Sequence, residues 1–261
     1  MPRKKIGFLK TIKCAGTSVQ NMLLRYSIKH NLNVVLPKGE KPGAGDPDFD
    51  YSVQNLNGIK VQKKFSRKQI EDTPWEKADL DYHMFLLHTY WNHHEISNVL
   101  NDQGNGDVFY FSIVRDPVML YRSYWDYFEL FKKFDTTLDQ YAKTVISKYL
   151  IQNNVTYCLP GYNLMLTYFG MNCHDMIKQD MSRNDAMKTN DYVQQKIDEI
   201  DETFNLILLA DEDNYDSGMI LLKHALCWEF EDMINVKRNV APKGQNSNIS
   251  EEAKIILKGK K

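Results

Sequence analysis

The stretch 7–26 near the N-terminus passes from an apolar strand pattern, through a turn rich in lysine and small residues, into a helical pattern that begins at Val19. A turn of this kind points consecutive backbone N–H groups outward at the start of a helix, where the helix macrodipole also favours negative charge. Two hydroxyl side chains and two lysines add further donors and full positive charges, so the turn is suited to an anion such as phosphate or sulfate. The residues that we expect to hold it are Lys10, Lys13, Ala15, Gly16, Thr17 and Ser18.

The order of residues distinguishes this turn from a Walker A loop. A Walker A loop ends in Gly-Lys-Ser/Thr, so that its lysine follows the glycine-rich turn and its hydroxyl reaches magnesium. Here the lysines precede Gly16, and a lysine at the strand end can lie over the bridging oxygen between two anionic groups. A P-loop phosphoryl transferase (kinase-like) is still one alternative, because the apolar run Leu206–Ala210 followed by Asp211 is similar to a Walker B strand. An ordinary strand-to-helix turn with surface lysines is another.

A second segment places an arginine at the carboxyl end of a strand. Phe109–Val114 is a near-continuous apolar run, which is typical of a strand covered on both faces, and Arg115 follows it before a helical pattern over 118–132. Ligands of open α/β sheets bind at the carboxyl ends of strands, so we expect Arg115 and the lysine turn to face one crevice. Ser123, two turns into the helical pattern, is expected near the same crevice.

Together these segments resemble the sulfotransferase superfamily. The first is similar to its 5′-phosphosulfate loop, and the second to its 3′-phosphate motif, in which an arginine at a strand end is followed eight residues later by a serine. More closely, Phe8–Asn21, Asp201–Ala210 and Leu226–Asp232 resemble the galactose-3-O-sulfotransferase family, of the galactosylceramide sulfotransferase type. These stretches follow the order of the family, from about residue 6 to about residue 238.

The resemblance implies a donor, an acceptor and an α/β fold. The donor is 3′-phosphoadenosine 5′-phosphosulfate (PAPS), which leaves as 3′-phosphoadenosine 5′-phosphate (PAP), and no metal is required. Lys13 would act on the bridging oxygen, while Arg115 and Ser123 would bind the 3′-phosphate. The acceptor is a sugar hydroxyl, the 3-hydroxyl of a terminal β-galactoside on a glycolipid or glycan. Further basic residues that could close over the 3′-phosphate are Lys237, Arg238 and Lys243.

Two residues of the turn depart from the family pattern. Ile12 stands where the family usually has histidine, and Cys14 where it has threonine or serine. We interpret Ile12 as a change in the wall of the pocket, because Lys13, which the leaving group needs, is kept. The departure also leaves open a non-catalytic relative that binds nucleotide or glycan. Cys14 would be reactive if the turn favours its thiolate.

Histidines are concentrated between residues 83 and 94, where a general base for the acceptor hydroxyl is expected. His88 follows the buried strand pattern Met84–Leu87, and glycan sulfotransferases place a histidine base after a comparable strand. We therefore expect His88 to be the base. His93 and His94 fall at a helix start and are expected to face solvent, with no metal site, since zinc prefers a tighter ligand set with cysteines.

Composition and patterning fit one domain. The 261 residues are 43% hydrophobic, enough for a sizeable core, and a formal net charge of −1 argues against a nucleic-acid partner. Strand and helix patterns alternate, so we expect a P-loop-like, mostly parallel sheet with helices on both faces. The catalytic domain would cover 1–261, with loop insertions near 38–81. The strand patterns are Ile6–Leu9, Val34–Leu36, Met84–Leu87, Tyr110–Val114 and Leu206–Ala210.

The cellular compartment is left open by the sequence. No apolar run approaches the length needed to span a bilayer, so membrane contact is expected only through an anchor that this chain does not contain. The resemblance implies the Golgi lumen for a form whose anchor was removed, and a divergent cytoplasmic form is the alternative. The four cysteines form no Cys-x-x-Cys pattern and neither prove nor exclude disulfides. Cys227 is expected to be a packed thiol in an apolar helix over 219–233.

Overall fold

A four-stranded parallel sheet in the order β4-β1-β5-β6 forms the centre of the computed structural model. Its strands are β1 (Ile6–Leu9), β4 (Met84–Phe85), β5 (Phe109–Val114) and β6 (Leu206–Leu209). The α/β class and the parallel sheet predicted from the sequence are confirmed. The structure describes residues 1–36, 53–56, 59–62, 64–67, 70, 81–146, 164–171, 186–211, 213–234 and 249–258.

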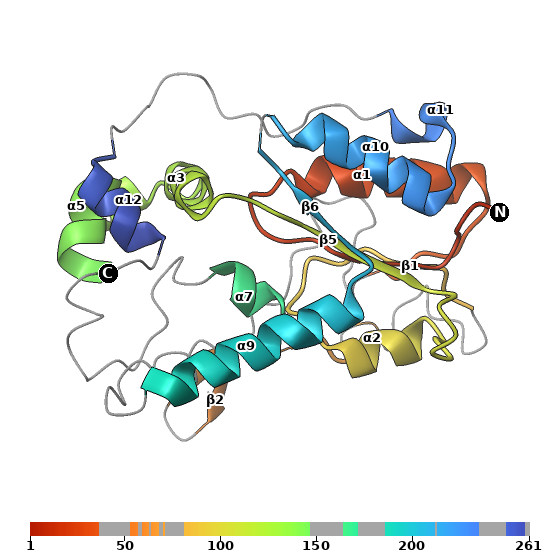
Figure 1. Ribbon diagram of the computed structural model, residues 1–261, viewed down its shortest axis with the longest axis horizontal. Coiled ribbons are helices and arrows are strands. Elements are labelled where there is room, and N and C mark those ends of the chain that lie inside the picture. The colour runs from red at the N-terminus through yellow and green to blue at the C-terminus, as the bar shows by residue number, and fades with distance from the viewer. Residues whose placement is uncertain are drawn as a thin grey trace.

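Helices cover both faces of the sheet (Figure 1). The helices α1 (Gly16–Lys29) and α10 (Tyr215–Leu226) lie on one face, and α2 (His93–Val99) and α9 (Ala186–Thr203) on the other. Alternate residues of each strand point to opposite faces, so a single strand serves two cores. Phe8 and Phe111 stack at 4.7 Å between ring centroids in the core under α1, whereas Tyr110 packs in the core under α2.

Two of the predicted elements are shorter or interrupted in the structure. Val34 forms only an isolated bridge to Met84, so the predicted strand over 34–36 is reduced to that pairing. The helix predicted over 118–132 is interrupted, because Glu129 takes a left-handed conformation with φ 48°. The resulting pieces are α3 (Pro117–Tyr127) and α4 (Leu130–Phe134).

The prediction of Cys227 as a packed thiol within a helix is wrong. Cys227 is exposed and ends α10 with φ 54°, and the Trp228 N–H donates to the Lys223 carbonyl at 3.1 Å. The chain turns there because Trp228 is buried against Tyr26, with 3.4 Å between the ring centroids. The short helix α11 (Phe230–Met233) follows the break.

The sheet changes its direction of winding next to β1. From β1 the chain crosses to β4 on one side, and from β4 it returns across β1 to β5 on the other. At such a switch point the loops after the two adjacent strands diverge to opposite faces, which leaves a crevice at their carboxyl ends. The loops that follow β1 and β5 therefore flank the position in this sheet where a ligand is expected.

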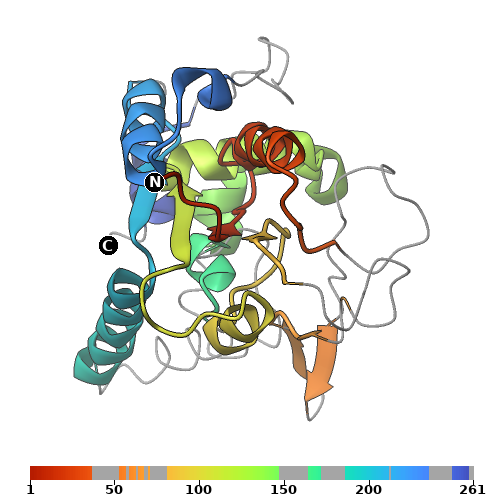
Figure 2. The ribbon, with the colours of Figure 1, turned by 90° about the vertical axis from the view of Figure 1, so that its right-hand side faces the viewer.

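Described residues within the predicted insertion near 38–81 include an antiparallel pair that stands apart from the main sheet (Figure 2). Its strands are β2 (Val53–Leu56) and β3 (Ile59–Gln62), and α7 (Leu164–Tyr168) lies on the α9 side of the sheet in Figure 1. None of the helices that the structure describes is long and apolar enough to cross a membrane.

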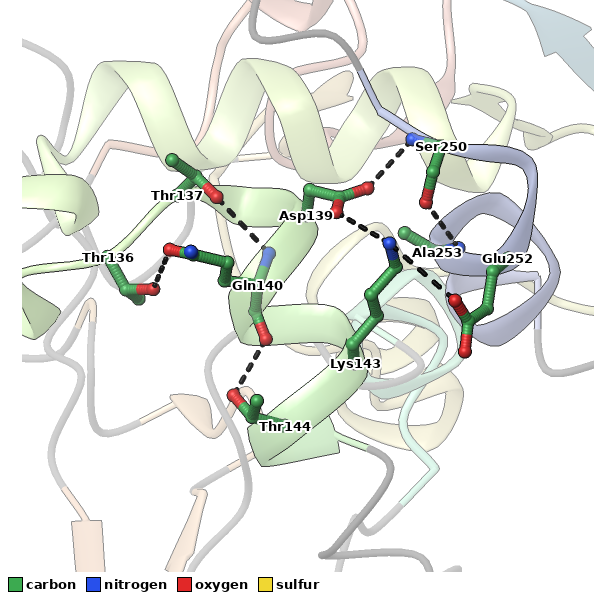
Figure 3. Close-up of polar contacts among 9 residues, drawn as sticks. All are labelled: Thr136, Thr137, Asp139, Gln140, Lys143, Thr144, Ser250, Glu252 and Ala253. Carbon is green, nitrogen blue, oxygen red and sulfur yellow. Dashed lines mark hydrogen bonds and ion pairs between the residues drawn. The ribbon is translucent and has the colours of Figure 1, made fainter.

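The C-terminal helix α12 (Glu251–Leu257) joins a smaller core with α3, α5 (Leu138–Tyr141) and the π-helix η2 (Ala142–Ile146). A polar network fixes its start (Figure 3). The Asp139 carboxylate accepts the Ser250 backbone N–H at 2.7 Å and pairs with the Lys143 ammonium at 2.8 Å. Ser250 in turn caps the helix by accepting the Ala253 N–H at 3.3 Å.

Acid is expected to weaken the attachment of α12 through Asp139. The bonds from Lys143 and Ser250 hold the pKa of Asp139 at about 2, below its ordinary 3.8. A depressed carboxyl pKa stabilises the fold above the ordinary value, and this contribution is lost as the pH falls toward 2. The thermal midpoints of wild type and Asp139→Asn should therefore differ near about pH 6 and converge toward about pH 2. A difference that is the same at every pH would contradict this reading.

Candidate active site

The turn after β1 is shaped by two left-handed residues. Lys13 has φ 57° and Ala15 has φ 58°, and between them the Cys14 thiol is buried and donates to the Ile12 carbonyl at 3.2 Å. Left-handed residues without glycine are uncommon and mark turns that the surrounding structure holds in place. α1 then begins at Gly16, and the Ser18 N–H of its first turn donates to the Ala15 carbonyl at 3.0 Å.

Lys10 lies beneath this turn, with only 3% of its surface exposed. Its ammonium donates to the Gln20 side-chain oxygen at 3.0 Å, and the Gln20 amide donates to the Leu86 carbonyl at 2.9 Å. A Cβ at Gly16 would lie 2.7 Å from Cγ of Lys10, so only glycine allows α1 to approach the lysine stem this closely. These contacts favour a supporting role for Lys10 under the anion turn.

The loop after β5 contacts the turn directly. The Arg115 guanidinium donates from Nη1 to the Lys13 carbonyl at 3.3 Å, and its Nε is buried with no hydrogen-bond partner among the described residues. Asp116 caps α3 by accepting the N–H groups of Val118 and Met119 at 3.0 and 3.1 Å. The predicted meeting of the lysine turn and Arg115 at one edge of the sheet therefore occurs in the structure.

Positive charge gathers at this edge of the sheet around Lys13. Burial, and then the neighbouring Arg115 guanidinium, lower the pKa of the Lys13 ammonium. Lys13 forms no ion pair with a carboxylate among the residues that the structure describes, and its Nζ lies 3.6 Å from the centroid of the Tyr127 ring. A cation held beside a second cation favours the binding of an anionic ligand.

The two departures from the family pattern are both buried. Ile12 belongs to the core cluster under α1, with 8% of its surface exposed. Burial raises the pKa of the Cys14 thiol to about 11. The thiol is therefore neutral near pH 7, and the idea of a reactive thiolate in the anion turn is not supported.

Of the residues predicted to bind the 3′-phosphate, Arg115 contacts the turn after β1, as described above. Ser123 lies half-buried on α3. Thr17, at the start of α1, is likewise half-buried. The remaining candidates fall outside the described residues, and they are Lys237, Arg238 and Lys243.

His88 lies three residues after β4, on the side of β1 opposite β5. Its ring is half-buried, with its centroid 5.2 Å from that of Tyr168. The anion turn after β1 is thus flanked by the loop that carries Arg115 on one side and the segment that carries His88 on the other. His88 therefore stays the predicted base.

The other histidines of the segment have separate surroundings. The His83 ring accepts the Asn33 N–H at 3.3 Å, which ties β4 to the chain after α1. His93 and His94 are exposed at the start of α2, but the Trp91 and Tyr110 rings beside the His93 ring keep water from part of it, and this desolvation lowers the pKa of His93. No group of three or more His, Cys, Asp or Glu side chains that could hold a metal ion occurs in the described ranges.

Two residues near the site had no functional role in the sequence analysis. Gln20 was not singled out, although it lies within a stretch that resembles the family. Tyr127 belongs to a run of aromatic residues at helical spacing, a pattern that more often marks core. Tyr121 and Trp125 of that run are buried, but Tyr127 is 58% exposed.

Comparison with known proteins assigns the chain to a family. The family model described as galactose-3-O-sulfotransferase matches residues 1–256. Galactose-3-O-sulfotransferase 2 from Mus musculus is 28% identical over 261 residues, which cover 97% of this chain and 57% of that protein. Galactosylceramide sulfotransferase from Bos taurus is 26% identical over 239 residues, which cover 91% and 49%.

The chain spans about half the length of the curated relatives that it matches. No solved structure matches it significantly. The match of the family model runs over almost the whole chain and includes the anion turn, Arg115 and His88. The chain therefore belongs to the galactose-3-O-sulfotransferase family.

Proposed function

We propose that this protein transfers the sulfuryl group of PAPS to the 3-hydroxyl of a terminal β-galactoside on a glycolipid or glycan. The observation that carries the proposal is the contact between Arg115 and the backbone of Lys13 at the switch point of the sheet. This contact brings two cations to the edge where ligands of α/β proteins bind. The names of the relatives, which specify galactose-3-O-sulfation and galactosylceramide, support the acceptor.

Each side chain has one task in the proposed reaction. The acceptor oxygen forms a bond to sulfur while the bond from sulfur to the 5′-phosphate oxygen breaks. Lys13 stabilises the charge that develops on that bridging oxygen, and the turn formed by residues 16–18 holds the sulfate and 5′-phosphate oxygens. His88 takes the proton of the attacking hydroxyl.

The remaining residues bind and support. Arg115 and Ser123 bind the 3′-phosphate, and Lys10 fixes the turn from below through Gln20. Lysine and backbone donors provide the charge compensation, so the proposed mechanism uses no metal and no nucleic-acid partner. The Golgi lumen is the proposed compartment, by analogy with the family.

Transfer of radiolabelled sulfate from PAPS tests the function. We expect labelled product on lactosyl, N-acetyllactosaminyl or galactosylceramide acceptors and none on the same acceptors blocked at the 3-hydroxyl. Binding of PAP without transfer to any galactoside would indicate a non-catalytic relative. Binding of ATP that depends on magnesium, without binding of PAP, would instead support the kinase-like alternative.

Arg115→Ala should selectively weaken the binding of nucleotides that carry a 3′-phosphate. Loss of a charge-assisted hydrogen bond should cost about 1.5–3 kcal/mol of PAP affinity. Adenosine 5′-phosphosulfate lacks the 3′-phosphate, so its affinity should hardly change. Calorimetric titration measures both ligands.

Arg25→Ala is the matched control for this prediction. Arg25 is an exposed residue of α1, and its loss removes the same charge without touching the loop after β5. Both affinities should remain as in wild type. Equal losses for the two nucleotides in Arg115→Ala would contradict the assignment of Arg115 to the 3′-phosphate.

A further inference from the structure

The Lys13 ammonium rests on an aromatic ring. Its Nζ lies 3.6 Å from the centroid of Tyr127, well within the distance at which a cation is attracted to the face of a ring. Tyr127 is the last residue of α3, and more than half of its surface is exposed. A lysine ammonium in water otherwise samples many rotamers, so contact with a fixed ring limits where this charge can be.

The ring itself is held by neighbouring aromatic residues. The Tyr127 and Phe128 rings form an edge-to-face pair with 5.0 Å between centroids and an interplanar angle of 86°. Phe128 packs in turn on Tyr124, one turn earlier in α3, with 4.6 Å between centroids. Such edge-to-face and tilted pairs are favourable for aromatic rings and reduce the freedom of Tyr127.

Lys13 is therefore held by both ends of one segment. Arg115, just before α3, binds its backbone carbonyl, and Tyr127, at the end of α3, contacts its side chain. Asp116 caps the first turn of α3 and stabilises the helix that separates these two contacts. The backbone and the charged end of Lys13 are thus oriented by one continuous segment, residues 115–127.

We infer that Tyr127 is a positioning residue for sulfuryl transfer, which holds the Lys13 ammonium toward the leaving bridging oxygen. This inference rests on the proposed function. The face of the ring occupies one side of the ammonium, and its N–H groups on the other side remain available to an anion. Tyr127 would thereby act on turnover more than on donor affinity, because alignment of the charge matters most as the bond breaks.

The test compares Tyr127→Leu with Tyr127→Phe. Removal of a cation–π contact should lower kcat by about 3- to 30-fold in Tyr127→Leu, with PAP affinity changed by less than about twofold. Tyr127→Phe keeps the ring face and should retain near-wild-type kcat. Phe230→Leu is the matched control, because Lys223 lies 4.5 Å from the Phe230 ring in a cation–π pair on a different helix.

Two further measurements separate positioning from a general structural effect. In the background of Lys13→Ala, Tyr127→Leu should cause no additional loss of turnover, since its target is gone. In spectra of isotope-labelled lysine, ring currents should displace the Lys13 side-chain signals in wild type and Tyr127→Phe but not in Tyr127→Leu.

The outcomes are distinguishable. If the wild type transfers sulfate and Tyr127→Leu has the same kcat, the role of Tyr127 is overturned and the proposed function stays intact. Losses that are additive with Lys13→Ala, or that Phe230→Leu reproduces, would also overturn it. A wild type that binds PAP but transfers no sulfate would overturn the proposed function itself, and the role of Tyr127 with it.

Discussion

Replacement of Lys13 by alanine is expected to cut turnover by on the order of a hundredfold or more, the usual effect of removing one group that stabilises transition-state charge. Lys13 is suited to this role because it follows β1 at the switch point and is oriented through its backbone by Arg115. Its pKa is lowered by burial and by Arg115, yet no carboxylate among the described residues neutralises it. An ammonium in this state can interact fully with a developing oxyanion.

The measurement is kcat at saturating PAPS and acceptor, with PAP affinity determined in parallel. PAP lacks the sulfuryl group, so its binding should fall much less than turnover. Lys132→Ala is the control, because Lys132 is an exposed lysine of α4 that already pairs with Glu129 at 2.7 Å. If Lys13→Ala weakened PAP binding and turnover by the same factor, Lys13 would be a binding residue rather than a catalytic one.

The second large effect is expected at His88. A general base contributes about 10²–10⁴-fold to rate, so His88→Ala should reduce turnover by on the order of a hundredfold or more. Donor affinity should be unchanged, because the Arg115 loop and the His88 segment lie on opposite sides of β1. The base must be deprotonated to accept the hydroxyl proton, so wild-type activity should fall on the acid side and this limb should vanish in His88→Ala.

The neighbouring histidines provide the controls for this prediction. Single replacements of His83, His93 and His94 should leave the acid limb in place. His93 is the sharpest of them, since burial lowers its pKa and a neutral imidazole could also accept a proton. Near-full activity of His88→Ala with an unchanged acid limb would place the base elsewhere.

The sequence was sufficient for the features that depend on local pattern and sheet topology. Apolar runs predicted β1, β5 and β6, and basic residues at the carboxyl ends of two strands predicted that Arg115 and the lysine turn face one crevice, where the structure places them in contact. Helix ends were harder to predict. The α10 pattern continues past Cys227, but the burial of Trp228 against Tyr26 decides where the helix stops.

The direction in which side chains point was also not predictable from the sequence. Both lysines of the turn were expected to face the anion, since charge alone does not reveal whether a side chain lies under or over a loop. Asn92 and Glu95 have the spacing of a capping box at the start of α2, but Glu95 instead accepts the Arg67 N–H at 2.9 Å. A tertiary contact with a segment distant in sequence thus replaced a local one.

The buried contacts of Gln20 have a consequence for how the molecule can open. Gln20 joins the Lys10 ammonium to the Leu86 carbonyl, two residues before His88. Separation of the segment after β4 would leave a buried amide N–H without its acceptor, which costs about 1–3 kcal/mol. The turn after β1 and the segment after β4 that carries His88 are thus expected to open together, as one cooperative unit in amide hydrogen exchange. Changes that loosen the segment to admit a larger acceptor would also shorten the time for which the nucleotide stays bound.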